Sequence, residues 1–429
     1  MPGDRPTLTT ADPAVSPLAA PRRSGLTGTG VCAAAVFGLL IVGSNIPTPL
    51  FPIYRVDLAL TTATVSALFA VYLFALVVTF TLVAGSPLSR HASRVLPAAA
   101  TAAILGDVAL VLGADQLGWL FVGRILTGLA VGLGTGSAAT LVLATHGERG
   151  RAIAATGTLI GSFLGLLGSA LIAQYLPGPT VTVYLVHIAL LVTALALLGT
   201  ALIRNRRELH RSLHPSGDAV PVELSPRHAP DLPTPDAGPA SATPARSRRL
   251  RAAGYCLGIS GWAIGGIVVG LLPTIIAQEW SSSTVLTTAL APTVLIGAAC
   301  LAPVLIRRLP PLPVLVLIAV GAVSCTAGVL ALNLPAILIA CAIWGAGQGF
   351  AYASGLRIVT AGLSPIPQGR AASRYASVCY GCTGILSIST GIAATAFGAG
   401  TAMIAMAAVF VTFTGATAVA GHRRWPAGI

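Results

Sequence analysis

The sequence predicts an all-α membrane protein whose twelve transmembrane helices form two six-helix bundles. Its 429 residues are 55% hydrophobic and only 9% charged, whereas a soluble domain carries about 25% charged residues. Twelve apolar stretches are each long enough to cross the ~30 Å hydrocarbon layer as a helix. They fall into two sets of six on either side of a polar insert at about 203–250. A soluble enzyme is therefore excluded.

Each apolar stretch is expected to be helical, because the hydrocarbon layer cannot satisfy open backbone groups. Strands of a membrane β-barrel alternate apolar and polar residues over about ten positions, and runs such as Val314–Ala331 do not. The N-terminal set comprises about 30–51, 63–85, 95–114, 117–141, 152–175 and 180–203. The C-terminal set comprises about 252–276, 283–306, 312–332, 335–359, 371–394 and 398–421.

The polar segments divide the chain into five regions. The N-terminal segment is rich in Pro, Thr and Ser, and the central insert combines Pro with charged residues, so neither can bury a core. We therefore expect a disordered cytoplasmic tail at 1–28, an N-terminal six-helix bundle at 29–203, a flexible cytoplasmic linker at 204–250, a C-terminal six-helix bundle at 251–422 and a cytoplasmic tail at 423–429.

The distribution of arginine predicts that both termini are cytoplasmic. All 25 basic residues are Arg. With the N-terminus inside, only Arg55, Arg124 and Arg357 fall outside the cytoplasmic segments, as the positive-inside rule requires. We expect a multi-pass protein of the plasma membrane. The net charge of +13 follows from this topology, and no nucleic-acid partner is expected.

The two sets of helices carry a repeat at a constant offset of 219 residues. Three glycine pairs share this offset, and so does a Gly-Arg-Ala triplet that begins at Gly150 and again at Gly369. The glycine pairs are Gly128 with Gly347, Gly136 with Gly355, and Gly165 with Gly384. Parallel six-helix repeats describe one large class of secondary transporter.

Three local patterns carry further information. The segment between the second and third stretches reads Gly85-Ser-Pro-Leu-Ser-Arg90-His-Ala-Ser-Arg94. The fourth stretch contains Arg124-Ile-Leu-Thr-Gly128-Leu-Ala. The fifth contains glycines at intervals of four, where helix backbones can approach closely. These are Gly157, Gly161 and Gly165.

These patterns resemble the major facilitator superfamily of transporters, in its drug-efflux-like branch. Gly85, Arg90 and Arg94 match the family's loop motif, in which a Ser here replaces an Asp of the inner latch. The resemblance implies a role in proton coupling for Arg124. It implies that the glycines of the fifth helix form a closely packed, bendable helix pair at the interface between the halves, which favours efflux.

Asp107 is the one acid that lies well inside an expected span. Counted along their helices, Asp107 and Arg124 both lie roughly 10 Å below the outer surface. Helices three and four form a tight hairpin, so we expect the two side chains to pair. Charged groups in a span are costly and usually face a partner or a cavity. The pair is either a structural ion pair or part of proton coupling. His187 falls on the sixth helix, which is peripheral in the family, and we assign it no role.

The family's architecture implies that helices 1, 2, 4, 5, 7, 8, 10 and 11 line the substrate cavity. Aromatic side chains with a few polar groups suit an amphipathic ligand. The mid-depth candidates, besides Arg124, are Asn45, Tyr72, Trp262, Trp344, Gln348 and Tyr380.

We expect a secondary active transporter that exports a small amphipathic molecule by alternating access, coupled to protons. The alternatives are an uptake permease for a sugar or organic acid, or a non-transporting sensor on the same fold. A membrane enzyme would need paired acids, a His cluster or a soluble domain. We expect no cofactor and no metal, since the CxxC at Cys379 and Cys382 has no His or acid nearby. The expected partners are the substrate, membrane lipids and protons, and we expect a monomer.

Overall fold

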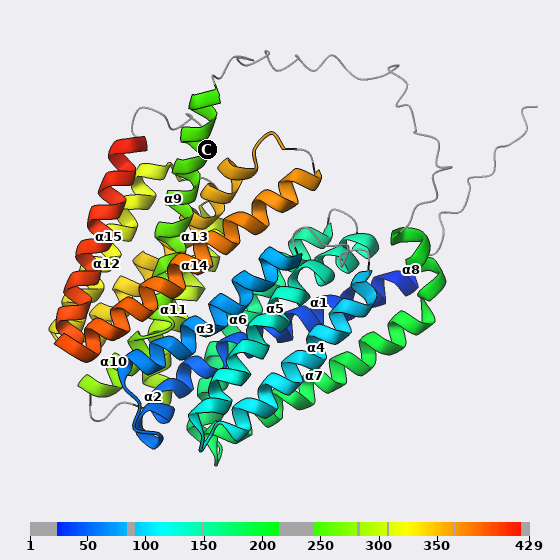
Figure 1. The fold of residues 1–429 in the computed structure, drawn as a ribbon, viewed down its shortest axis with the longest axis horizontal. Helices are drawn as coiled ribbons and strands as arrows, with labels where there is room; N and C mark the ends of the chain where they lie inside the picture. Colours follow the sequence, from blue (N-terminus) through cyan, green and yellow to red (C-terminus); the bar gives the residue numbers. More distant parts are fainter. Residues whose placement is uncertain are drawn as a thin grey trace, which may run out of the picture.

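The computed structural model describes residues 24–83, 91–146, 149–213, 244–280, 284–306, 309–363 and 365–421. These residues form helices and short connections, without a strand in the described ranges. Eleven of the described helices are long and apolar enough to cross a membrane, and Ile160–Tyr175 is a shorter apolar one. This confirms the expected fold class of two six-helix bundles (Figure 1).

Within the described ranges each half contains seven helices that belong to its spans, because the first span of each half is broken. The N-terminal helices are α1 (Ser24–Asn45), α2 (Pro47–Asp57), α3 (Thr62–Val83), α4 (Ala92–Leu112), α5 (Leu117–His146), α6 (Arg149–Tyr175) and α7 (Pro179–Arg204). The C-terminal helices are α9 (Pro244–Val268), α10 (Leu272–Glu279), α11 (Val285–Leu305), α12 (Pro311–Leu330), α13 (Leu334–Thr360), α14 (Pro365–Phe397) and α15 (Ala399–Gly421).

The two breaks occupy corresponding places. Proline lacks the N–H that continues a helical ladder, and Pro47 stands at the start of α2. In the C-terminal half, Pro273 stands at the start of α10, after the turn at 269–271. Each half therefore begins with a long helix that ends in a short, separately oriented segment.

The halves also repeat the same helix packing. The neighbours α4–α5, α1–α5, α3–α5, α1–α6 and α4–α7 have the counterparts α12–α13, α9–α13, α11–α13, α9–α14 and α12–α15. Across the interface, α3 packs on α14 and α11 packs on α6. This exchange is what a two-fold axis along the membrane normal produces, as the sequence repeat indicates.

The halves are joined most closely at the end that carries α2 and α10, which we call the tip face; the opposite end is the base face. α10 packs on α2 there, at the lower left of Figure 1. The N–H of Ala63 donates to Oγ1 of Thr395 across the interface at 2.9 Å. A Cβ at Gly270 would lie 2.7 Å from the ring of Phe69. Toward the base face the helix ends of the two halves diverge (Figure 1).

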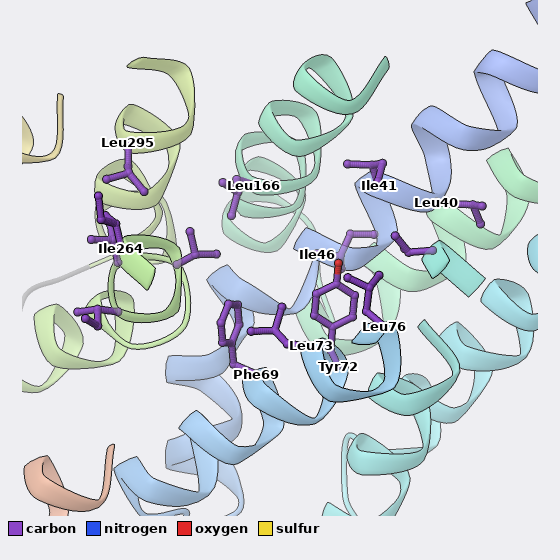
Figure 2. Close-up of a cluster of buried hydrophobic side chains, with 14 of the residues drawn as sticks. Leu40, Ile41, Ile46, Phe69, Tyr72, Leu73, Leu76, Leu166, Ile264 and Leu295 are labelled. Carbon is purple, nitrogen blue, oxygen red and sulfur yellow. The ribbon is translucent and has the colours of Figure 1, made fainter. Parts of the chain in front are cut away.

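The buried core runs without a gap from one half to the other. Figure 2 shows Tyr72, Leu166, Ile264 and Leu295, which come from α3, α6, α9 and α11, around one apolar region. The interface is therefore apolar at mid-depth, where Ile264 and Leu295 have no exposed surface.

Three helix boundaries differ from the expected domain limits. α1 begins at Ser24, inside the expected tail at 1–28. Part of the expected linker is helical: α8 (Arg206–Leu213) packs on α5 and α7, and α9 begins at Pro244. Leu209, one apolar residue in a charged segment, is buried and anchors α8. Residues 1–23, 214–243 and 422–429, with most of both tails and of the linker, lie outside the described residues.

Candidate functional site

Arg124 is a buried cation between three helices of the N-terminal half. From α5 its Nε donates to the carbonyl of Leu68 on α3 and its Nη1 donates to the carbonyl of Ser44 on α1, each at 3.1 Å. The guanidinium carbon lies 4.5 Å from the ring centre of Tyr72, a cation–π distance. Its Nη2 has no hydrogen-bond partner in the described part of the chain. Arg124 therefore ties α5 to α1 and α3 and keeps one donor unused.

The expected pair of Asp107 with Arg124 is wrong. Oδ2 of Asp107 lies 2.7 Å from Nδ1 of His187 on α7, and this is the contact that the carboxylate makes among the described side chains. The other ring nitrogen of His187, Nε2, lies 2.9 Å from the carbonyl oxygen of Leu39 on α1. Asp107 and His187 are each 2% exposed.

The error has a geometric cause. Asp107 and Arg124 do lie at the same level, because α4 and α5 meet beside these residues: a Cβ at Gly106 would lie 3.3 Å from the carbonyl oxygen of Gly123. Consecutive residues of an α-helix point about 100° apart. Because Gly106 faces α5, Asp107 faces α7 instead.

An aromatic cluster lines the interface between the halves. Trp262 of α9 lies between Tyr352 of α13 and Tyr380 of α14, with ring centres 4.5 Å and 5.0 Å away. Tyr380 in turn lies 6.1 Å from Phe80 of α3, on the other half. On its far side Tyr352 lies 5.3 Å from Tyr375. Two of the expected cavity residues, Trp262 and Tyr380, are thus neighbours.

A cavity of about 590 Å³ lies beside this cluster, between the base-face ends of α3, α9 and α14. Its wall combines aromatic rings, hydroxyl groups and two cations, without an acid among the lining residues. The lining residues are Phe80, Thr81, Tyr255, Arg370, Ser373, Arg374, Ser377 and Val378. It can accept a molecule with an apolar body and a polar or anionic end.

The other expected cavity residues take different places. Gln348 lies on α13 one turn from Tyr352; it is 3% exposed and its Oε1 has no hydrogen-bond partner among the described residues. Trp344 does not face the cavity: it is fully buried against Phe410 and the backbone of Gly321. Trp344 precedes Gln348 by one turn of α13, but its indole fills the space beside Gly321 of α12.

The side chains of Asn45 and Tyr72 make their contacts within the N-terminal half. The amide of Asn45 donates to the carbonyl of Ile41 at 2.9 Å and to the hydroxyl of Ser44 at 3.1 Å, at the end of α1. Tyr72 presents its ring face to Arg124. Figure 2 shows its ring among Ile46, Leu73 and Leu76.

The glycine positions on α5 and α6 are close contacts. A Cβ at Gly128 would lie 2.5 Å from the carbonyl oxygen of Tyr72. At Gly161 and Gly165 it would lie 2.6 Å from carbonyl oxygens of α1, whereas at Gly157 the nearest atoms are 3.9 Å away. The glycine face of α6 therefore packs on α1 within the N-terminal half. The expected position at the interface between the halves is wrong, because there α6 presents Phe163 toward Gly297 of α11.

Of the loop motif, Gly85 and Arg90 lie outside the described residues, and Arg94 is exposed on α4. Among the described residues no three His, Cys, Asp or Glu side chains come together as a metal site. Sequence reasoning missed His187, Tyr352, Phe80 and the pair Arg370 and Arg374. The spacing of Tyr352 four residues after Gln348 was a usable signal, since such residues share a helix face.

Comparison with known proteins agrees with this architecture. A family model described as Major Facilitator Superfamily matches residues 33–388. The comparison with curated protein sequences gave no match. Among solved structures, a nucleoside transporter, NupG, is similar at 16% identity and a TM-score of 0.60, covering 92% of this chain and 98% of that one.

A D-xylose-proton symporter is similar at 13% identity and a TM-score of 0.66, covering 92% and 97% of the two chains. A POT family transporter in complex with a thioalcohol-conjugated peptide is similar at 13% identity and a TM-score of 0.65, covering 92% and 96%. At these identities the likeness shows a common fold.

Proposed function

The chain belongs to the major facilitator superfamily of membrane transporters, and from that premise we propose that it exports a small amphipathic molecule, coupled to protons. The observation that supports this most is the aromatic cluster of Trp262, Tyr352 and Tyr380, whose Tyr380 lies against Phe80 in the wall of the cavity between the halves. Aromatic rings offer large apolar surfaces against which apolar and planar groups can pack. The substrate we propose therefore has an aromatic or apolar body.

The polar groups of the cavity refine this proposal. Arg370 and Arg374 are exposed at its wall together with Ser373 and Ser377. Two cations without a lining acid repel a cationic ligand and attract an anionic one. Outside the cavity wall, Gln348 lies one turn from Tyr352, and its buried amide oxygen, without a partner among the described residues, offers an acceptor for a hydrogen-bond donor on the substrate. We propose a neutral or anionic amphiphile over a cationic one.

The packing of the halves supports alternating access as the mechanism. The contacts at the tip face hold that end together, while the cavity lies at the base face. We propose that the base face is cytoplasmic, because the positive-inside rule favours Arg-rich segments there, and that the protein lies in the plasma membrane. The described conformation would then receive substrate from the cytoplasm and release it outside after the halves rock.

Arg124 is the proposed organiser of the N-terminal half during this motion. It holds α1 next to the break at Pro47 through the carbonyl of Ser44, and it holds α3, the helix that packs on α14, through the carbonyl of Leu68. A movement of α1 relative to α3 must change one of these two bonds. The unused Nη2 donor is available for a new partner in the other state.

The second candidate function is uptake of an organic acid. Arg370 and Arg374 favour it, because paired cations suit a carboxylate. The fold also serves a D-xylose-proton symporter. The direction of transport distinguishes export of an amphiphile from uptake of an organic acid.

The test compares accumulation of neutral, anionic and cationic amphipathic dyes in cells that lack the protein and in cells that overexpress it. We expect overexpression to lower accumulation of neutral and anionic dyes, and Trp262→Ala to restore it. The matched control is Trp119→Ala, because Trp119 is 41% exposed on the outer surface of α5. Increased accumulation of anionic dyes would favour uptake, and unchanged accumulation of all three classes would refute transport of amphiphiles.

A further inference from the structure

Two titratable side chains meet in the apolar interior of the N-terminal half, outside the aromatic cavity. Asp107 comes from α4 and His187 from α7, and Oδ2 of one lies 2.7 Å from Nδ1 of the other. Both side chains are almost fully buried. Burying a carboxyl group and an imidazole is costly unless they are hydrogen-bonded, and here each has the other as its partner.

The contact between His187 and the backbone of α1 shows which ring nitrogen carries a hydrogen. The carbonyl oxygen of Leu39 can only accept a hydrogen bond, so Nε2 of His187, 2.9 Å away, carries a hydrogen and donates it. The short contact between Nδ1 and Oδ2 then contains one further proton. That proton belongs either to an imidazolium beside a carboxylate or to a carboxylic acid beside a neutral imidazole. In both forms the pair is neutral overall, which suits its apolar surroundings.

A glycine of α1 makes this contact possible. A Cβ at Gly43 would lie 2.5 Å from Cε1 of His187 and 3.3 Å from each ring nitrogen. The ring is held at both nitrogens, so it could relieve such a contact only by giving up one of these bonds. Gly43 stands one turn after Leu39, so its missing side chain lets the imidazole reach the carbonyl of Leu39.

We propose that Asp107 and His187 form a single-proton binding site, and that the bound proton fastens α4 and α7 to the backbone of α1. The proposal deepens the proton coupling proposed above and rests on it. Loss of the proton to water leaves a carboxylate opposite the lone pair of Nδ1, and these two repel each other. The ring must then turn or move, and its bond to Leu39 is weakened.

The same segment of α1 connects this site to Arg124. His187 holds the carbonyl of Leu39, and Arg124 holds the carbonyl of Ser44, just before the break of the first span. If His187 releases the carbonyl of Leu39, α1 can shift while Arg124 still holds the carbonyl of Ser44. Protonation of this site is thereby transmitted along α1 to the break before α2, and α2 packs on α10 and α11 of the other half.

Other ionisable groups around the site are few in the described part of the chain. Tyr184 of α7 precedes His187 by three residues and lies within electrostatic range of Asp107 and of Arg124 on α5. From α2, the hydroxyl of Tyr54 donates to that of Tyr184 at 3.1 Å. α1 contributes a backbone group to this site, the carbonyl of Leu39. The site therefore contains one acid and one base, with a polar link toward the tip face.

The test uses nitrogen-15 NMR of the full chain in lipid nanodiscs, with labelled histidine and without any transport substrate. Loss of a signal in His187→Gln assigns His187 among the seven histidines. We expect a protonated Nε2 at every pH and an Nδ1 signal that changes as the pH is raised and the site loses its single proton. Asp107→Asn should abolish the change, since an amide can donate to Nδ1 but cannot share a proton.

Two glycine variants separate the site from general packing. Gly43→Ala should shift the His187 signal and weaken its link to Leu39, whereas Gly38→Ala should leave it unchanged, because a Cβ there meets only an atom 3.9 Å away. A His187 signal that does not change with pH, or that is the same in Asp107→Asn, would overturn the proposal. Failure of the dye accumulation test with a normal NMR titration would instead refute the transport function alone.

Discussion

Replacing Arg124 by Lys should destabilise the protein more than replacing it by Met, although Lys keeps the charge. A lysine ammonium is a point charge and cannot bond the carbonyls of Leu68 and Ser44 simultaneously in the geometry that the guanidinium uses. It also loses the planar stacking on Tyr72. The cation remains buried, without a carboxylate at ion-pair distance among the described residues.

The magnitudes follow from these contacts. Arg124→Lys loses one charge-assisted hydrogen bond, about 1.5–3 kcal/mol, and up to about 2 kcal/mol of cation–π attraction. The expected loss of unfolding free energy is therefore about 2–5 kcal/mol. Arg124→Met loses both hydrogen bonds and the cation–π contact but also removes a buried charge, whose desolvation costs several kcal/mol. We expect its unfolding free energy to stay within about 2 kcal/mol of the original.

Heating in the presence of a thiol-reactive fluorescent dye measures this order. Cys325 and Cys341 are buried and free, so the dye reports exposure of the core of the C-terminal half, which is continuous with that of the N-terminal half. We expect the midpoint temperature to fall in the order original, Arg124→Met, Arg124→Lys. If Lys were as stable as Arg and Met much less stable, the guanidinium would have a counter-ion that these contacts do not include, and the reasoning would fail.

Three further outcomes are expected. Gly165→Ala should cost about 1–3 kcal/mol by overpacking, because its Cβ would lie 2.6 Å from a carbonyl oxygen of α1; Gly168→Ala has open space and should be neutral in the same thermal assay. Trp344→Ala should lower the unfolding free energy by about 3–5 kcal/mol, whereas Trp262→Ala should reduce dye export with a smaller change of the midpoint temperature. The reverse result would show that Trp262 packs the core and that Trp344 serves transport. Arg374→Gln should reduce transport of anionic dyes more than of neutral ones, most clearly at low salt; equal loss for both would contradict an anion-binding role.

The fold could be predicted because it depends on features that the chain displays locally. Apolar length sets the number of spans, and hydrocarbon forces each span to be helical. The constant offset between glycines such as Gly128 and Gly347 indicated the repeat that the helix packing shows. The boundary at α8 was missed because one buried apolar residue, Leu209, anchors a charged segment. Composition does not register a single contact of this kind.

The candidate site was predicted in part. Aromatic residues at mid-depth are visible in the sequence, and two of those expected to share a site, Trp262 and Tyr380, lie side by side. Trp344 was assigned to the same cavity and packs elsewhere. Depth along a helix can be counted, but the direction of a side chain around the helix axis depends on which face the neighbours cover.

The sequence by itself therefore determined the class of the protein, the approximate limits of its membrane spans, their duplication and the matching level of Asp107 and Arg124. Only the tertiary structure decided the partners: Asp107 with His187, and Arg124 with the carbonyls of Ser44 and Leu68. The physical reason is rotation about the helix axis. One residue changes direction by about 100°, so Gly106 faces α5 and Asp107 faces α7, a choice made by packing against helices that are distant in the chain.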